Sequence, residues 1–331
     1  MKNRDRFTSH ELVQIYEDML MLRRFEEKAA QLYGMGLIGG FCHLYIGQEA
    51  VAVGIAKAIQ PNDTIITSYR DHGFMLSVGS CPKKVMSELL GKETGCSKGK
   101  GGSMHMFDIE KRFYGGHGIV GAQVSLGTGI AFAHKYNNSQ SISVTIYGDG
   151  ASHQGQVYES FNMAKLWKLP VLYIIENNEY AMGTSVNRSS STINLYKRAN
   201  SFGIESQQVD GMDFFEVYNA VQKACNYIKM NDSPYLLEFK TYRYRGHSMS
   251  DPGQYRTKDE IENYKSSRDP INWMKHFILK ETKSSDQELG LIDKKIKRYV
   301  AECAEYALNS AQPSEDQLYT HVYKEKLKNE S

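Results

Sequence analysis

Two runs of apolar residues near the middle of the chain, at 143–147 and 171–175, have the length and β-branched composition of buried strands. Residues 154–166 between them have a helical composition. Together these segments predict a βαβ unit, in which a right-handed crossover joins two parallel strands. Both strands then end at the same edge of a parallel sheet, which is where α/β proteins bind their ligands.

Further patterns place more helices and strands around this unit. After a capping box at Thr8-Ser9-His10-Glu11, residues 10–34 repeat apolar side chains at helical spacing and predict one long opening helix. Beyond residue 257 the composition is polar and helical, with a second capping box at Thr257-Lys258-Asp259-Glu260 and a last helix at 291–308. The other expected elements are strands at 64–67 and 235–240 and helices at 48–59, 82–91 and 213–229.

The order of these elements predicts an α/β fold with a mostly parallel sheet flanked by helices. The 331 residues contain no internal repeat or low-complexity tract, and an apolar share of 41% is enough for a substantial core. We therefore expect a single domain over residues 1–331, with the opening helix at 10–34 and a helical C-terminal extension at about 257–331.

Composition argues against several classes of ligand and location. The net charge of +2 is too small for nucleic acid as the main ligand, because binding a phosphate backbone needs a concentrated excess of Lys and Arg. No stretch approaches the roughly 20 apolar residues of a membrane span. Five cysteines without a CxxC pair indicate reduced thiols rather than disulfides or a zinc site. The charged start lacks the apolar segment of a secretory signal, so we expect a bacterial cytoplasmic protein, although a processed organelle protein would have the same features.

Residues suited to cofactor chemistry follow the two central strands. Gly148-Asp149-Gly150 comes after the first strand, and Asn177-Asn178 after the second. The glycines let the backbone approach a phosphate, while a carboxylate and an amide oxygen are ligands suited to Mg²⁺. Alternatively, the first motif is only a turn and the second only a helix cap, because short motifs are weakly specific. Strand, spacing and paired asparagines together favour a diphosphate site with a bridging divalent ion.

This combination of motif, spacer and paired asparagines resembles the signature of the thiamin-diphosphate enzymes. The resemblance implies thiamin diphosphate and Mg²⁺ as cofactors. It gives the metal three protein ligands, namely Asp149, the side chain of Asn178 and the main-chain oxygen of Tyr180, with diphosphate oxygens and water completing an octahedron. Gly150 and Ala151, which follow Asp149 directly, belong to the implied cofactor-binding set.

Further segments resemble the α subunits of pyruvate dehydrogenase E1, in the two-subunit 2-oxo acid dehydrogenase family, and the resemblance covers residues 10 to 325. The segments are Gly40-Phe41-Cys42-His43-Leu44, Gly47-Gln48-Glu49-Ala50, Ser68-Tyr69-Arg70-Asp71-His72-Gly73, Lys98-Gly99-Lys100-Gly101-Gly102-Ser103-Met104-His105, Gly118-Ile119-Val120-Gly121-Ala122-Gln123 and Tyr242-Arg243-Tyr244-Arg245-Gly246-His247-Ser248-Met249-Ser250-Asp251-Pro252-Gly253. The combination is far more specific than any one of these segments.

The same resemblance assigns residues to the cofactor. It places Tyr69 and Arg70 on the diphosphate, which an arginine binds with two parallel hydrogen bonds, whereas an isolated arginine more often forms a surface salt bridge. Main-chain groups of Gly118 and Val120 would bind the aminopyrimidine, and the alternative is a turn used only for helix packing. Arg243 would orient a loop and the phosphate end of the cofactor, with a surface charge clamp as its alternative.

Five histidines fall within the matched segments, and imidazoles can steer the charge changes of a decarboxylation. The resemblance puts His43 and His247 at the active centre as catalytic residues, with His247 also at the cofactor. For His72, His105 and His117 structural and functional roles remain equally open. Many relatives carry asparagine at position 117, so a polar role there is doubtful.

The loop at 243–256 contains three arginines, two glycines and several hydroxyl groups. This composition argues against a buried element and predicts a mobile loop that the cofactor orders. In eukaryotic relatives the serine at the position of Ser248 is a regulatory phosphorylation site. This loop is one residue shorter and lacks their second serine, so kinase control is not expected here.

The resemblance implies decarboxylation of pyruvate, with the thiazolium ring as electron sink, and transfer of the acetyl group to the lipoyl group of an acyltransferase, E2. In these enzymes the glutamate that activates the pyrimidine belongs to a β subunit, and Glu49 is not assigned that role. We therefore expect an α2β2 heterotetramer and an inactive isolated chain. The alternatives are an acetoin or other 2-oxo acid dehydrogenase α subunit, a non-catalytic diphosphate-binding subunit, and a nucleotide-binding module through Lys98 and Lys100, which lacks the GxxxxGK[ST] order.

Overall fold

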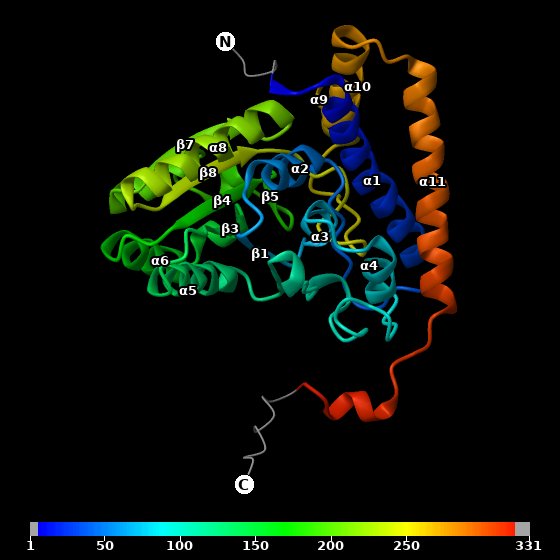
Figure 1. Cartoon of the computed structure of the whole chain (residues 1–331), viewed down its shortest axis with the longest axis horizontal. Coiled ribbons are helices and arrows are strands. Elements are labelled where there is room, and N and C mark those ends of the chain that lie inside the picture. The colour runs from blue at the N-terminus through cyan, green and yellow to red at the C-terminus, as the bar shows by residue number, and fades with distance from the viewer. Residues whose placement is uncertain (1–5, 322–331) are drawn as a thin grey trace.

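Six parallel strands form the central sheet in the computed structural model, which describes residues 6–321. The sheet has the order β2-β1-β3-β4-β8-β7, and every neighbouring pair is parallel. The strands are β1 (Thr64–Ser68), β2 (Phe113–His117), β3 (Ser143–Gly148), β4 (Val171–Asn177), β7 (Glu205–Asp210) and β8 (Tyr235–Lys240). The predicted α/β fold with a parallel sheet is therefore confirmed (Figure 1).

The sequence patterns located the inner strands β1, β3, β4 and β8 but not β2 and β7. Both missed strands lie at the edges of the sheet. β2 contains two glycines, and five of the six residues of β7 are polar or charged. An edge strand is covered on fewer sides than a central one, so it needs no apolar run and gives little signal in the sequence.

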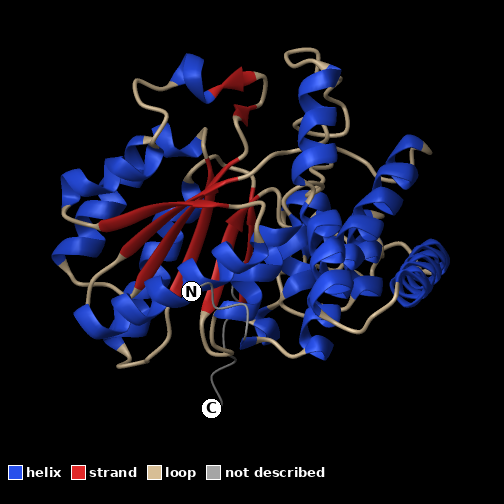
Figure 2. Ribbon diagram, turned by 90° about the horizontal axis from the view of Figure 1, so that it is seen from above, coloured by secondary structure: helices blue, strands red, loops and turns tan. Residues whose placement is uncertain are grey.

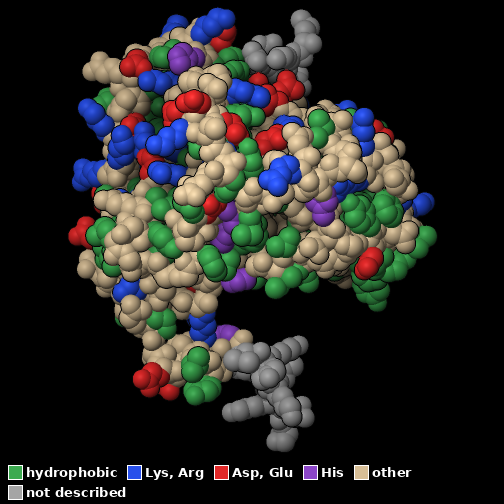
Figure 3. Space-filling model, turned by 180° about the vertical axis from the view of Figure 1, so that it is seen from behind, with side chains coloured by type: hydrophobic (Ala, Val, Ile, Leu, Met, Phe, Trp, Pro, Cys, Tyr) green, Lys and Arg blue, Asp and Glu red, His purple; other side chains and the backbone are tan. Residues whose placement is uncertain are grey.

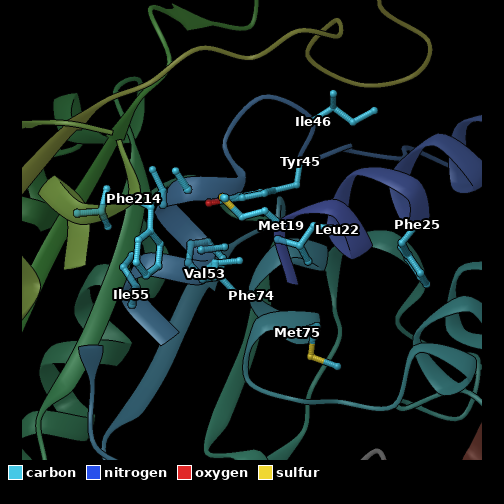
Figure 4. Close-up of a cluster of buried hydrophobic side chains, with 14 of the residues drawn as sticks. Met19, Leu22, Phe25, Tyr45, Ile46, Val53, Ile55, Phe74, Met75 and Phe214 are labelled. Carbon is cyan, nitrogen blue, oxygen red and sulfur yellow. The ribbon is translucent and has the colours of Figure 1, made fainter. Parts of the chain in front are cut away.

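Inner strands are apolar on both sides because the sheet separates two cores. In β4, Leu172 and Ile174 point into one core, while Val171, Tyr173 and Ile175 point into the other. This explains why β4 is a continuous apolar run rather than an alternating pattern. Figure 4 shows part of the larger core, where side chains of the opening helix pack against Tyr45, Val53 and Phe74.

Helices cover both faces of the sheet (Figure 2). α5 and α6 contribute to the smaller core, whereas α1, α2, α4, α8, α10 and α11 contribute to the larger one. The helices are α1 (Ser9–Gly34), α2 (Glu49–Ala58), α3 (His72–Ser77), α4 (Pro82–Leu89), α5 (Ala122–Tyr136), α6 (Gly155–Leu166), α7 (Val186–Ser189), α8 (Phe214–Asn231), α9 (Lys258–Arg268), α10 (Pro270–Glu281) and α11 (Asp286–Asn309), and a small hairpin joins β5 (Tyr180–Ala181) to β6 (Thr184–Ser185).

The predicted capping box at the start of α1 is present, with Thr8 and Glu11 each bonding the other's backbone N–H. At α9 only half of the second box forms. Thr257 accepts from the Glu260 N–H, but the Glu260 carboxylate instead accepts from the hydroxyls of Tyr180 and Tyr242. Tertiary partners therefore outcompete the local cap, and they tie α9 to the loops beside the sheet.

The C-terminal extension is helical as predicted as far as the structure describes it, and residues 322–331 lie outside the described part. Its last helix, α11, begins at Asp286, five residues before the expected start, behind a third capping box formed by Ser285 and Glu288. α11 packs along α1 and α4. The expectation of a single domain stays a prediction.

All five cysteines are free, as expected, but Cys81 is exposed and Cys96 half-buried. Within residues 6–321 we find no helix long and apolar enough to span a bilayer.

Candidate active site

A cavity of about 250 Å³ opens at the carboxyl edge of the sheet, beside β1 and β3. Chain order reverses between these two strands, because β2 lies on the far side of β1 whereas β4 lies on the far side of β3. Ligands of open α/β sheets bind at such a switch point. The cavity is lined by Ser68, Tyr69, Arg70, Val120, Gly121, Gln123, Gly148, Asp149, Gly150, Ala151, Glu176, Asn178, Tyr180, Ala181, Met182, Arg243 and His247.

The structure brings together most of the residues predicted from the sequence. The ten that line the cavity are Tyr69, Arg70, Val120, Asp149, Gly150, Ala151, Asn178, Tyr180, Arg243 and His247. Gly118 and His43 lie outside the lining. Gly118 faces the His105 ring, which would come within 3.1 Å of an added Cβ, and His43 lies behind Tyr69 and His247.

Asp149 lies directly after the last residue of β3 and is 3% exposed. Burial raises the pKa of its carboxyl to about 6, against the opposing effect of the nearby Arg243 guanidinium. Gly150 next to it leaves room for the hairpin, since an added Cβ would lie 2.6 Å from the Ala181 side chain. A buried carboxylate at the carboxyl edge of the sheet is suited to bind a cation.

Arg243 hydrogen-bonds two of the three oxygens that the family resemblance assigns to the metal. Its Nη1 donates to Asn178 Oδ1 at 3.2 Å and to the main-chain oxygen of Tyr180 at 3.0 Å. Asn178 is held in this orientation because its Nδ2 donates to Gln48 Oε1 at 2.9 Å. These oxygens thus converge on one positively charged nitrogen, which marks the position as attractive to cations.

The donor set around this position fits a hard divalent ion. It offers one carboxylate, one amide oxygen and one main-chain oxygen, and Mg²⁺ binds such oxygens together with phosphate oxygens and water. No cluster of three or more His, Cys, Asp or Glu side chains suited to a metal occurs in the described part of the chain. At the position beside Asp149, phosphate oxygens and water would supply the remaining ligands of such an ion.

The two adjacent asparagines have different tasks. Asn177, the last residue of β4, donates its Nδ2 to Glu238 Oε1 at 2.7 Å, and its Oδ1 accepts from the Glu179 N–H at 3.1 Å. Glu238 is fully buried in β8. Asn177 therefore joins neighbouring strands and shapes the turn after β4, which leaves Asn178 free to face the cavity.

Three aromatic rings form a cluster beside the cavity. The centroid of the Tyr69 ring lies 4.5 Å from that of the His43 ring and 5.4 Å from that of the His247 ring. The centroids of the two imidazoles are 5.2 Å apart. Burial and the charge of Arg70 lower the pKa of His43 to about 2 and that of His247 to about 3, so both are neutral. The Nδ1 atoms of both rings are buried without a hydrogen-bond partner among the described residues, and of the two rings only His247 lines the cavity.

Arg70 is held rigidly between two loops. Its Nη1 donates to the main-chain oxygen of Leu44 at 2.6 Å and its Nη2 to that of His247 at 2.8 Å. Burial, with the like charge of Arg243, lowers the pKa of Arg70 to about 10. The two guanidinium groups form a positive region at the cavity that suits an anionic ligand.

The loop at 243–256 differs from the sequence prediction. Arg243 is 1% exposed, and Tyr244, Ser248 and Arg256 are also buried. Arg245, Ser250, Pro252 and Gln254 are exposed, so the loop is buried only in part. The alternative of a surface clamp for Arg243 is wrong, because this side chain is buried. Burial is possible because the loop's polar groups bond one another, for example Tyr255 Oη to Asp251 at 2.7 Å and Arg243 Nη2 to Tyr255 Oη at 2.8 Å.

Two buried polar residues in the cavity lining were missed by the sequence analysis. Gln123 donates a hydrogen bond from Nε2 to the Ile146 oxygen at 3.1 Å, while its Oε1 is buried with no hydrogen-bond partner within residues 6–321. Glu176 accepts a short hydrogen bond from Tyr45 Oη, and burial raises the pKa of Glu176 to about 7. A charged residue near the end of the apolar run of β4 was the available signal for Glu176.

The glycine-rich run at 95–102 is not free to bind a nucleotide phosphate. Glu88, which is fully buried, accepts from the N–H groups of Ser97, Gly99, Gly101 and Gly102 at 2.7 to 3.1 Å. The backbone donors that would hold a phosphate are thus already used by a carboxylate of the protein itself.

The other three histidines of the matched segments, His72, His105 and His117, have protein partners. His72 is fully buried against Glu26, with Nδ1 3.0 Å from its carboxylate. His105 Nδ1 lies 3.3 Å from the Gly116 oxygen, and His117 Nε2 lies 3.3 Å from the Tyr114 oxygen. Histidine side chains reach the surface near the middle of the face shown in Figure 3.

Comparison with known proteins gives one family for almost the whole chain. The family model described as dehydrogenase E1 component matches residues 17–315. "Pyruvate dehydrogenase E1 component subunit alpha" of Rickettsia bellii is 57% identical over 313 residues, which are 95% of this chain and 96% of that protein. The protein of the same name from Rhizobium meliloti is 55% identical over 96% of this chain and 91% of its own length. A mitochondrial relative from Dictyostelium discoideum, also named as this α subunit, is 48% identical over 95% and 82%. The chain therefore belongs to the dehydrogenase E1 component family.

Proposed function

We propose that this chain is the α subunit of a pyruvate dehydrogenase E1 component that uses thiamin diphosphate and Mg²⁺. The observation that supports the proposal is that Asn178 Oδ1 and the Tyr180 oxygen meet at one nitrogen of Arg243. Asp149 and Arg70 line the same cavity at the switch point of the sheet. When bound, thiamin diphosphate supplies the electron sink for decarboxylation of a 2-oxo acid. The printed names of the relatives favour pyruvate over acetoin as the substrate.

At the phosphate end of the cofactor, the protein would bind the metal ion and the negatively charged diphosphate. Asp149, Asn178 and Tyr180 would hold the metal, and Tyr69, Arg70 and Arg243 would hold the diphosphate. Because Arg243 Nη1 now bonds two of the proposed metal ligands, it would have to yield them to the metal and could then turn to a phosphate oxygen. Gly150 would allow the close approach that a diphosphate needs, and Ala151 lines the cavity beside it.

At the reacting end we assign His247 and His43 as catalytic residues. Their neutral rings have free Nδ1 atoms and lie against Tyr69. A neutral imidazole can donate or accept one hydrogen bond without adding charge near the carboxylate of a substrate. Main-chain groups of Val120, with Gly118 close by, would contact the aminopyrimidine.

A β subunit completes the site in this proposal. Ile119, Val120 and Met182 expose 75%, 42% and 67% of their surface, although Val120 and Met182 line the cavity. Apolar side chains beside a polar cavity are typical of a surface that a partner covers. We propose an α2β2 heterotetramer that passes the acetyl group to a lipoyl-bearing acyltransferase, in the bacterial cytoplasm.

The test uses the assembled αβ complex with Asp149→Ala. We expect this variant to lose Mg²⁺–thiamin diphosphate binding in isothermal titration while its thermal unfolding stays close to that of the wild type. Asp63→Asn is the matched control, because Asp63 is also buried but precedes β1 at the opposite edge of the sheet. Unchanged cofactor affinity in Asp149→Ala would overturn the metal assignment.

A further inference from the structure

A buried chain of hydrogen bonds runs from the opening helix to the aromatic cluster. Glu26 on α1 lies 3.0 Å from His72 Nδ1, and His72 Nε2 lies 2.8 Å from Ser103 Oγ. Ser103 Oγ in turn accepts from the His43 N–H at 3.1 Å. All four residues are at most 5% exposed.

Carboxylate, imidazole and hydroxyl follow one another here as in the catalytic triad of serine hydrolases. Burial excludes a nucleophilic role, because Ser103 is only 4% exposed and a substrate carbonyl would have to reach its Oγ. That Oγ also accepts a backbone N–H already. The arrangement is therefore suited to holding backbone in place rather than to attacking a substrate.

Glu26 has a second branch that leads to the cavity itself. Its Oε1 accepts from the Tyr45 N–H at 2.8 Å, and the Tyr45 hydroxyl donates to Glu176 in the cavity lining. The Tyr45 ring lies among buried side chains of α1, α2 and α3 (Figure 4). Gly73 makes this path possible, because an added Cβ would lie 2.4 Å from the Tyr45 ring.

From these contacts we infer that Glu26 is a positioning residue, which fixes His43 through His72 and Ser103 and fixes Glu176 through Tyr45. This inference rests on the proposed function, since it takes the cavity and the His43 cluster as the active centre. Two backbone N–H groups of one segment, those of His43 and Tyr45, are held by this network. The segment therefore cannot shift along its axis without breaking both hydrogen bonds.

Charge strengthens the network. Burial opposes a charged imidazole, but the Glu26 carboxylate, together with Asp71 and the Ser103 main-chain oxygen, outweighs burial and raises the pKa of His72. A protonated His72 donates from both ring nitrogens, to Glu26 on one side and to Ser103 on the other. Hydrogen bonds to charged groups are about twice as strong as neutral ones, so the positions they fix are well defined. A small displacement of a catalytic group is costly, with about 1 Å able to reduce a rate by about a hundredfold.

The experiment compares Ser103→Ala and Glu26→Gln with Asp63→Asn in the assembled αβ complex. Asp63 is a buried carboxylate that accepts from the Ile142 N–H at 2.7 Å, at the opposite edge of the sheet. Amide hydrogen exchange is measured at His43 and at Ile142, and steady-state kinetics are measured at saturating cofactor. Glu26→Gln keeps the side-chain volume, so it still answers the question if Ser103→Ala does not assemble.

We expect exchange at His43 to accelerate at least about tenfold in both network variants while exchange at Ile142 is unchanged, with the reverse in Asp63→Asn. We also expect kcat to fall at least about fivefold in the network variants, with KM for pyruvate within about twofold of wild type, because positioning acts on the reacting geometry. Ser103→Thr, which retains the hydroxyl, should restore part of kcat.

Unchanged exchange at His43 would overturn the inference, and so would an equal loss of kcat in Asp63→Asn at a matched loss of thermal stability. Faster exchange at His43 with an unchanged kcat would overturn its link to catalysis. Failure of the proposed function has a different signature, namely a wild-type complex that does not decarboxylate pyruvate, and the exchange measurements remain decisive in that case.

Discussion

In the proposed site, the buried carboxyl of Asp149 should make cofactor binding sensitive to pH. Burial raises its pKa to about 6 in the free protein. A divalent ion binds only the ionised carboxylate, so protons compete with the metal. The carboxyl is ionised above its pKa, so metal affinity is lost as the pH falls through about 6.

The size of the effect follows from the ionised fraction. With a pKa of about 6, roughly nine-tenths of Asp149 is ionised at about pH 7 and roughly one-tenth at about pH 5. The affinity for the metal and its diphosphate should therefore fall about tenfold between these values, which corresponds to about 1.4 kcal/mol.

The assay is isothermal titration of Mn²⁺ and thiamin diphosphate into the assembled complex across this range, corrected for protonation of the free diphosphate. Glu176 also has a raised pKa, about 7, so Glu176→Gln serves as a control and should keep the pH dependence. Asp149→Asn offers a weaker, neutral oxygen, so its affinity should be lower and nearly independent of pH. A wild-type affinity that stays constant between about pH 5 and 7, or an equal slope in Asp149→Asn, would refute the reasoning.

Three further predictions test the loop, the partner and the core. Ser248 is buried next to His247, with its Oγ 2.9 Å from Ser250 Oγ, so Ser248→Glu should reduce kcat in steady-state kinetics at least about tenfold, or about 1.4 kcal/mol, whereas Ser248→Ala should cost little. A glutamate variant with wild-type turnover would contradict the placement of this loop at the active centre. The isolated chain should not decarboxylate pyruvate in a CO₂-release assay until a β subunit is added, and robust release by the purified chain alone would disprove obligate pairing. Ile174 is fully buried in β4, so Ile174→Ala should lower the free energy of unfolding by about 2–5 kcal/mol in chemical denaturation. A loss below about 1 kcal/mol would show that neighbouring side chains fill the space left by the substitution.

Local patterns were sufficient for the inner elements of the fold and for placing Asp149 and Asn178 in one cavity. The apolar runs of β3 and β4 are continuous because two cores enclose the sheet, and the cap of α1 is encoded within four residues. Asp149 and Asn178 could be placed together because parallel strands joined by a right-handed crossover must end at the same edge. These features depend on short stretches of sequence or on general rules of chain geometry.

Tertiary structure alone decided the contacts between distant segments. Tyr45 and Glu176 are 131 residues apart, and Glu26 and His72 are 46 apart, so no local pattern could pair them. It also decided that Arg243, Ser248 and Arg256 in the loop at 243–256 are buried, although the composition of this loop is that of an exposed one. The physical reason is that a polar group can be buried once a partner satisfies it, and that partner is supplied by the fold rather than by neighbouring residues.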